Sequence, residues 1–304
     1  MKQYIENFIE MMAVERASSY NTQYAYRKDL QYFCNYLEGR KIDFMRIDQE
    51  TIREYLKYIN KYDIKNNTSA RKLSSLRQFY KFLYQENILS HNPMNGIESP
   101  KLSKNLPKII SVNYIMQLIE YIKSQINRNS SDAINKFRLQ RFLSQIEILY
   151  STGIRRDELI NIKVNDLQLN QNLIKVLGKR NKERLVPLII NLKKRIEDYL
   201  KYRKEIKTNF PFLFITKTGR KIGPSLVYRV VKNYFSKVST KVKTSPHVLR
   251  HSFATHMLNN GADINSIKEM MGHSSLASTQ IYTKIKLPKI INDYKKNHPR
   301  ERKN

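Results

Sequence analysis

The sequence predicts a mainly α-helical protein of two domains, the second of which carries a small β-hairpin. Three observations lead to this fold class. Apolar residues recur at helical spacing through most of the first 90 residues. A segment rich in proline, glycine and asparagine at 92–111 interrupts any regular element. An alternating, β-branched run surrounds a polar turn at 173–189. We therefore place an N-terminal domain at 1–100, a linker at 101–108 and a second domain at 109–304.

The N-terminal domain is predicted to contain four helices. Residues 1–19 mix glutamates into an apolar pattern, which indicates an amphipathic helix rather than a signal peptide. Further helices are expected at 18–40, ending near Gly39, at 48–60 with Asp48 as the N-cap, and at 67–87. The last helix presents basic side chains either to solvent or to DNA, and these are Arg71, Lys72, Arg77 and Lys81.

The second domain is predicted to begin with a helix at 112–123. A polar stretch at 124–136 follows, which we expect to be a loop or an insertion, and then a strong helix at 137–153. After the hairpin, two helices are expected in the basic stretch that extends to residue 240. Ser245 and Pro246 mark the start of another helix that ends at Gly261, and Asp263 and Gly272 bound the next one.

The charge of the chain points to a polyanionic partner. Its 304 residues include 56 lysines and arginines against 26 acidic residues, a net charge of +30, of which residues 101–304 contribute +27. Such a field favours nucleic acid, with a membrane surface or the ribosome as alternatives on charge alone. The single cysteine, Cys34, excludes a disulfide framework and suits a reducing cytoplasm. No apolar run approaches the roughly 20 residues of a membrane span.

Residues suited to phosphate chemistry fall in four segments of the second domain. The segments hold Arg155 and Glu158 after a Thr-Gly turn, Lys179 in the hairpin turn, His247 and Arg250 at a helix start, and His273 followed nine residues later by Tyr282. Glu158 shares a helix face with Arg155 and can orient its guanidinium group. His247 and Arg250 share the positive end of a helix, where anions bind.

Each segment also has an ordinary structural interpretation: an exposed arginine–glutamate pair, a solvated basic turn, a polar loop histidine and a structural tyrosine. A zinc pair formed by His247 and His251 is another alternative, but the sequence offers no obvious third ligand. The grouping favours chemistry, because four of the six histidines fall between residues 247 and 273 in the most basic part of the chain.

Two arginines, two histidines, a lysine and a tyrosine, without metal ligands or paired carboxylates, suit the cleavage of a phosphodiester. Charge that develops on the non-bridging oxygens then needs fixed donors, and arginine forks match phosphate geometry without deprotonating. A lysine in a hairpin can protonate a leaving 5′ oxygen, and a tyrosine hydroxyl can be a nucleophile that conserves the phosphate energy in a covalent bond. We expect no cofactor and no metal.

The sequence resembles the tyrosine recombinases, or integrases, and among them the Xer-type site-specific recombinases. The resemblance covers nearly the whole chain and rests on "YSTGIRRDEL", "GKRNKERLVPL", "HVLRHSFATHML" and "GHSSLASTQIYT", together with the "SPKLSKNLPK" linker and a basic tail. The spacings make it specific, as in Xer proteins: Arg250 follows His247 by 3 positions, His273 follows Arg250 by 23, and Tyr282 follows His273 by 9.

The resemblance implies a four-helix-like, SAM-like core-binding domain and an α-rich catalytic domain, which together form a C-shaped clamp around DNA. It also implies a role for each candidate side chain. Tyr282 attacks the phosphate and forms a 3′-phosphotyrosine, while Arg155 and Arg250 bind the non-bridging oxygens with support from His273. Lys179 is the general acid, His247 is the acid–base partner near the tyrosine hydroxyl, and Glu158 supports Arg155. The basic helix at 67–87 is the expected DNA contact of the first domain.

The implied assembly is a homo- or hetero-tetramer on two double-stranded DNA sites, with a second Xer-type recombinase and a DNA translocase as candidate partners. The C-terminal segment 287–304 would dock into a neighbouring subunit. The implied role is chromosome dimer resolution in the cytoplasm, at the nucleoid. The alternatives are a mobile-element integrase or invertase, a type IB topoisomerase and a non-catalytic architectural DNA-binding protein. Two features depart from the family pattern: Arg180 replaces a usual glycine, and the polar stretch 124–136 is longer than expected.

Overall fold

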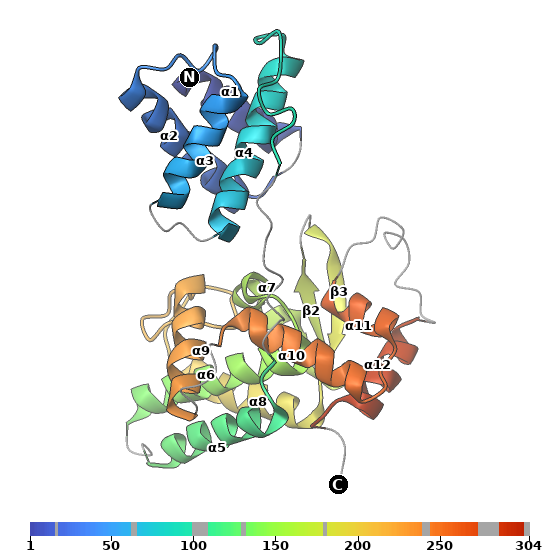
Figure 1. Cartoon of the computed structure of the whole chain (residues 1–304). Coiled ribbons are helices and arrows are strands. Elements are labelled where there is room, and N and C mark those ends of the chain that lie inside the picture. The colour runs from blue at the N-terminus through green and yellow to red at the C-terminus, as the bar shows by residue number, and fades with distance from the viewer. Residues whose placement is uncertain are drawn as a thin grey trace. The chain divides into compact units, whose positions relative to one another are not determined.

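The computed structural model describes residues 1–15, 18–61, 66–98, 109–128, 132–178, 181–238, 244–272 and 286–300. The expected positions Lys179, Arg180, His273 and Tyr282 lie outside these residues. The chain divides into two compact units, Met1–Asn105 and Leu106–Asn304 (Figure 1). Each unit has a hydrophobic core of its own, and the two are described separately.

The N-terminal unit is built from four helices, α1 (Lys2–Val14), α2 (Tyr20–Arg40), α3 (Gln49–Lys61) and α4 (Asn66–Gln85) (Figure 1). Their starts follow from local capping. Ser19 accepts a hydrogen bond from the Thr22 amide at the start of α2, and Asp48 accepts one from the Thr51 amide at 2.8 Å at the start of α3. Aromatic rings fill much of the core between the helices, namely Phe8, Phe33, Tyr55, Phe79 and Tyr80.

The second unit is also mainly helical. Its helices are α5 (Val112–Arg128), α6 (Ala133–Thr152), α7 (Arg156–Asn161), α8 (Ile190–Lys204), α9 (Pro224–Val238), α10 (Pro246–Asn259), α11 (Ile264–Met271) and α12 (Lys286–Asn297). Helix α6 is central, because every residue from Leu139 to Thr152 is buried and α5, α8 and α10 pack around it (Figure 1). A helix that is buried on all sides cannot show a simple amphipathic stripe.

A small antiparallel sheet completes this unit, with strands β1 (Leu167–Gln168), β2 (Leu173–Leu177) and β3 (Glu183–Pro187) in the order β1-β2-β3. In the β2–β3 hairpin Leu177 pairs with Glu183 and Lys175 with Leu185. The hairpin prediction and the mainly α fold class are therefore confirmed. The two-residue strand β1 was not predicted, since it is too short to show an alternating pattern.

The prediction of a loop over the polar stretch 124–136 is wrong. Helix α5 continues to Arg128, because Ile126 extends the buried apolar stripe of that helix by one more turn. Helix α6 already begins at Ala133, where Asp132 acts as the N-cap and accepts a hydrogen bond from the Asn135 amide at 2.9 Å. The polar residues at 124–128 and 133–136 therefore belong to helix ends, and 129–131 lie outside the described residues.

The C-terminal helix α12 packs onto its own unit. Ile290 and Tyr294 belong to the core of the second unit, and the Tyr294 hydroxyl donates to the Ser151 carbonyl at 2.8 Å. Just beyond α12, Arg300 donates to the buried Glu147 carboxylate at 3.1 Å. Exchange of this segment between subunits stays a prediction. Of the helices in the described ranges, none is both long and apolar enough to cross a lipid bilayer.

Candidate active site

The turn between α6 and α7 delivers Arg155. Helix α6 ends at Thr152, and Gly153 takes a left-handed conformation with φ of +61°. A Cβ atom at Gly153 would lie 2.4 Å from Cδ1 of Phe253 on α10, so the turn and the close approach both need glycine. The chain then extends, and Arg155 becomes the N-cap residue of α7 with its side chain 37% exposed.

Glu158 anchors Arg155 from the first turn of α7. Its carboxylate accepts from the Arg155 amide at 2.7 Å and from the Arg155 guanidinium at 2.9 Å. It also accepts two hydrogen bonds from Arg184 on β3, at 3.0 and 2.8 Å. Burial raises the pKa of Glu158, but the hydrogen bonds and charges of Arg184 and Arg155 outweigh that effect, so its pKa lies below the usual value and the carboxylate is ionised at neutral pH.

Three arginines converge on the C-terminal end of α11. Arg250 donates to the carbonyls of Gly153 at 2.5 Å and Met271 at 2.7 Å. Arg155 donates to the carbonyls of Met271 at 3.4 Å and Gly272 at 3.2 Å, and Arg184 donates to that of Met270 at 2.8 Å. Carbonyls in the last turn of a helix lack partners within it and carry the negative end of its dipole, so cations are favoured there.

Arg250 is almost fully buried, with 7% of its surface exposed. Burial, together with the charge of nearby Arg155, lowers the pKa of Arg250 to about 10, so its guanidinium group stays charged at neutral pH. The helix that carries it begins as predicted: Ser245 caps α10 by accepting from the Val248 amide, and Pro246 occupies the first turn. His247 lies exposed in this first turn, three residues before Arg250.

The structure therefore brings together three of the predicted site residues, Arg155, Glu158 and Arg250. Lys179, His273 and Tyr282 lie outside the described residues; Gly178 directly precedes Lys179, and Gly272 directly precedes His273. In the parts of the chain that are described, no three histidine, cysteine, aspartate or glutamate side chains lie close enough to hold a metal ion.

Arg184 is the site residue that sequence reasoning missed. Arg184 and Val186 both lie on the buried face of β3, two residues apart. An arginine at an apolar, inward strand position is itself a sign of a buried ionic contact. That sign was hidden by the surrounding basic residues, which make Arg184 resemble one more charge of a solvated turn.

The basic residues predicted to face DNA from α4 do not form one exposed surface. Lys72 is only 7% exposed, which contradicts the expected display. Its amine lies 3.7 Å from the buried carboxylate of Asp29 and 3.7 Å from the ring centroid of Tyr32. Arg71 and Lys81 are exposed, and Arg77 is partly buried. Arg71 also pairs with Asp29, and Arg77 donates to the Ile97 carbonyl. A DNA contact by these three residues stays a prediction.

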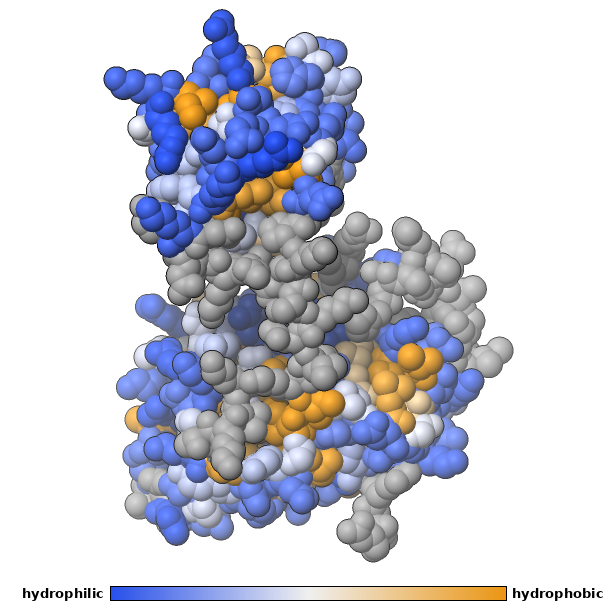
Figure 2. Space-filling model, in the orientation of Figure 1, coloured by the Kyte–Doolittle hydropathy of each residue, from blue (hydrophilic) through white to orange (hydrophobic). Residues whose placement is uncertain are grey.

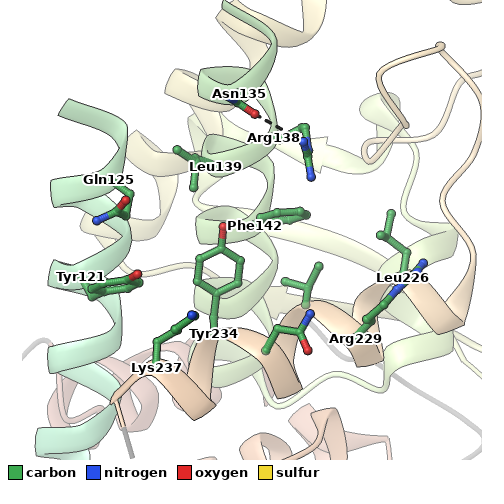
Figure 3. A pocket seen from close by; sticks show the side chains of 12 residues that line it. Tyr121, Gln125, Asn135, Arg138, Leu139, Phe142, Leu226, Arg229, Tyr234 and Lys237 are labelled. Carbon is green, nitrogen blue, oxygen red and sulfur yellow. Dashed lines mark hydrogen bonds between the residues drawn. The ribbon is translucent and has the colours of Figure 1, made fainter. Parts of the chain in front are cut away.

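Hydrophilic residues cover most of the visible face of each unit, interrupted by small apolar patches (Figure 2). A cavity of about 620 Å³ opens between α5, α6 and α9, where the ring of Phe142 lies 5.4 Å from that of Tyr234 (Figure 3). Arg138 lines this cavity and precedes Arg155 by 17 residues. Arg138 lies 14 residues before Thr152, the last residue of α6, which is about 21 Å along the helix at 1.5 Å per residue. No residue of the arginine cluster lines the cavity.

Residues 110–287 match the phage integrase family, and residues 5–87 match the phage integrase N-terminal SAM-like domain. The chain belongs to the phage integrase family of tyrosine recombinases. The resemblance that the sequence motifs indicated is therefore confirmed, as is the SAM-like character of the first domain. This recombinase is an enzyme that cleaves and rejoins DNA in a site-specific manner.

Curated relatives of this recombinase are named as Xer proteins. It is 35% identical over 297 residues to tyrosine recombinase XerD of Rhizobium meliloti (strain 1021), which covers 97% of this chain and 94% of the relative. It is also 35% identical over 302 residues to tyrosine recombinase XerC of Thermodesulfovibrio yellowstonii, covering 97% and 96%.

Solved structures show the same fold in distant proteins. XerH site-specific recombinase bound to palindromic difH substrate has a TM-score of 0.70 at 20% identity and covers 95% of this chain and 83% of that one. The Tn1549 transposon integrase in complex with transposon right end DNA has a TM-score of 0.69 at 18% identity, with coverage of 94% and 97%.

Proposed function

We propose that this recombinase binds a double-stranded DNA recombination site and that Tyr282 attacks the scissile phosphate between Arg155 and Arg250. One observation carries the proposal. Both guanidinium groups donate to the Met271 carbonyl, although one comes from the α6–α7 turn and the other from α10. Two permanent cations therefore lie together directly before the segment that holds His273 and Tyr282.

The proposed reaction uses only groups of the chain and the DNA. The Tyr282 oxygen forms a bond to phosphorus while the bond to the 5′ oxygen breaks, which leaves a 3′-phosphotyrosine and a free 5′-hydroxyl. His247 takes the tyrosine proton, and Lys179 gives a proton to the leaving oxygen. Arg155 and Arg250, with His273, meet the charge on the non-bridging oxygens. Rejoining reverses these steps with a 5′-hydroxyl from another strand.

The proposed assembly is a tetramer on two DNA sites, homomeric or formed with a second Xer-type recombinase, and a DNA translocase is a candidate partner. Its supporting observation is the near-full-length similarity to relatives named XerC and XerD. We propose chromosome dimer resolution at the nucleoid, in the cytoplasm, as the role. The alternative is integration or inversion by a mobile element; the Tn1549 transposon integrase has the same fold at 18% identity.

The first experiment is to recover and sequence the genomic DNA that becomes covalently attached to the wild-type protein in cells. A single chromosomal sequence would support dimer resolution, and sites that flank an element would support integration. A nicked duplex carrying the recovered sequence then traps the covalent complex in vitro. We expect the wild type to form this complex in EDTA, since the proposed groups need no metal.

The nucleophile is tested with Tyr282→Phe on the same nicked duplex. We expect normal binding and no covalent complex, because the ring remains and the attacking oxygen is gone. Tyr294→Phe is the matched control, since it removes a hydroxyl from the same C-terminal region that donates to a backbone carbonyl instead, and it should still form the complex. A covalent adduct on Tyr282→Phe would show that another residue attacks.

A further inference from the structure

Arg184 carries a full charge but only 5% of its surface is exposed. Both terminal nitrogens of its guanidinium group donate to Glu158, one to each carboxylate oxygen, and Nε donates to the Met270 carbonyl. Such a planar, bidentate arrangement fixes geometry more strictly than a lysine could. Arg184 therefore joins β3 to the start of α7 and to the end of α11.

Two glycines lie beside this guanidinium group, and both directly precede residues of the proposed catalytic set. A Cβ atom at Gly272, directly before His273, would lie 2.9 Å from Nη1 of Arg184. A Cβ atom at Gly178, directly before Lys179, would lie 3.4 Å from the same nitrogen. The guanidinium group thus lies beside the residue that directly precedes Lys179 and beside the residue that directly precedes His273.

The charge balance around Glu158 explains why a second arginine is needed. A buried carboxylate requires compensation by hydrogen bonds and positive charge. Among the described residues, Arg184 donates two side-chain hydrogen bonds to Glu158 and Arg155 donates one. If Arg184 were lost, the uncompensated carboxylate would attract the guanidinium group of Arg155 more strongly and compete with a phosphate for it.

We propose that Arg184 is a positioning residue: it balances Glu158 and holds the end of α11, so that Arg155 and Arg250 present their charge to the scissile phosphate. This inference rests on the proposed function, since it takes these two arginines as the phosphate ligands. Arg184 itself acts through Glu158 and the Met270 carbonyl.

The test compares Arg184→Lys with wild type on the nicked duplex that carries the recovered genomic site. We expect DNA affinity within about twofold of wild type and a covalent cleavage rate reduced about 10- to 100-fold, the effect that mutation of residues orienting metal ligands has in metalloenzymes. Arg141→Lys is the matched control, because Arg141 is also buried (3% exposed) and also donates to a backbone carbonyl, that of Ile215. It should cleave like wild type.

Two modified substrates separate positioning from a merely structural role. A methylphosphonate at the scissile position removes one negative oxygen, so the deficit of Arg184→Lys should shrink to about threefold or less because less charge needs arginine. A 5′-bridging phosphorothiolate gives a leaving group that needs no proton, and there the deficit should persist. An equal deficit on all three substrates would mean that Arg184 only supports the fold. If the cleavage rate of Arg184→Lys recovers only on the phosphorothiolate substrate, Arg184 would act through the Lys179 hairpin instead. Both results would overturn the proposal.

A second pair of variants covers the case in which Arg184→Lys is poorly folded. Arg184→Gln leaves Glu158 under-compensated, and the double variant Arg184→Gln/Glu158→Gln removes the excess charge. We expect the double variant to cleave at least about tenfold faster than Arg184→Gln, and an equal or slower rate would refute the charge argument. If wild type itself forms no covalent complex, the proposed function fails, whereas normal wild-type cleavage with an unimpaired Arg184→Lys overturns this inference alone.

Discussion

Replacing Gly153 with alanine perturbs the turn that both ends α6 and positions the arginines. The added Cβ would lie 2.4 Å from Cδ1 and 2.8 Å from Cε1 of Phe253. Phe253 is 1% exposed and follows Arg250 by three residues on α10. Arg250 also donates to the Gly153 carbonyl. The substitution should therefore reduce both the stability of the second unit and the rate of DNA cleavage.

The magnitude follows from two terms. A left-handed conformation costs alanine about 1–2 kcal/mol relative to glycine, of which about 0.4–1 kcal/mol is offset by the stiffer unfolded chain. Moving the Phe253 ring out of a packed core costs about 1–3 kcal/mol. The expected loss is about 3 kcal/mol, which in a unit of about 200 residues lowers the melting temperature by about 6–12 °C.

Calorimetry of the whole chain measures this loss, and cleavage of the nicked duplex measures its effect on the site. A displacement of about 1 Å at Arg250 is enough to reduce the rate by about 100-fold. Gly39→Ala is the matched control. Gly39 lies in α2 with nothing within 4 Å of its would-be Cβ, so the same substitution should stabilise the N-terminal unit by about 0.5–1 kcal/mol.

The result that refutes this reasoning is a Gly153→Ala protein that melts within 2 °C of wild type, since a tolerated Cβ would mean that the glycine is not required by the turn. If Gly153→Ala is destabilised but cleaves DNA at the wild-type rate at low temperature, the clash with Phe253 is supported. The same result would show that the α6–α7 turn does not set the position of Arg250.

Three further predictions concern buried charge. Glu158→Gln should weaken the second unit by about 3–5 kcal/mol at pH 7 in urea unfolding, because it leaves a buried arginine without its carboxylate. The pKa of Glu158 is lowered on folding, so its contribution is present above about pH 4.5 and is lost as the pH falls through the folded pKa. Burial, aided by the charge of Arg300, lowers the pKa of His298 to about 3. Thermal melts should show about 2 kcal/mol of stability lost between pH 6.5 and 5, and His298→Phe should lack that loss. Lys72→Met should destabilise the N-terminal unit. Lys81→Ala should leave the stability of that unit unchanged and lower its DNA affinity, and the slope of log affinity against log salt concentration should become shallower by about one.

Much of the fold could be predicted because its signals are local. The caps at Asp48, Ser245 and Asp263 lie within three residues of the amides that they accept from, and the β2–β3 hairpin shows its alternation within 15 residues. The loop predicted at 124–136 failed for the opposite reason. Polar residues at helix ends look like a loop in sequence, and only packing of Ile126 against the core shows that α5 continues.

The candidate site divides in the same way. Arg155 and Glu158 are three residues apart, so their contact could be predicted from helical spacing. Arg184 meets Glu158 across 26 residues of sequence, and Arg155 meets Met271 across 116. No local pattern identifies the partner in either contact, and the basic residues around Arg184 hid the inward strand position that could have marked it.

By itself the sequence indicated the family of this protein, because it places a tyrosine, two arginines, two histidines and a lysine at the spacings of a tyrosine recombinase. It also predicted most of the described helices and the β2–β3 hairpin. Those features depend on residue type and on neighbours a few positions away. Tertiary structure alone decided which charges are buried. Lys72, which the sequence placed on a basic surface, lies beside Asp29 and Tyr32, and Arg184 lies between Glu158 and the end of α11. Burial is set by what other segments bring to a residue, so it is fixed only when the chain has folded.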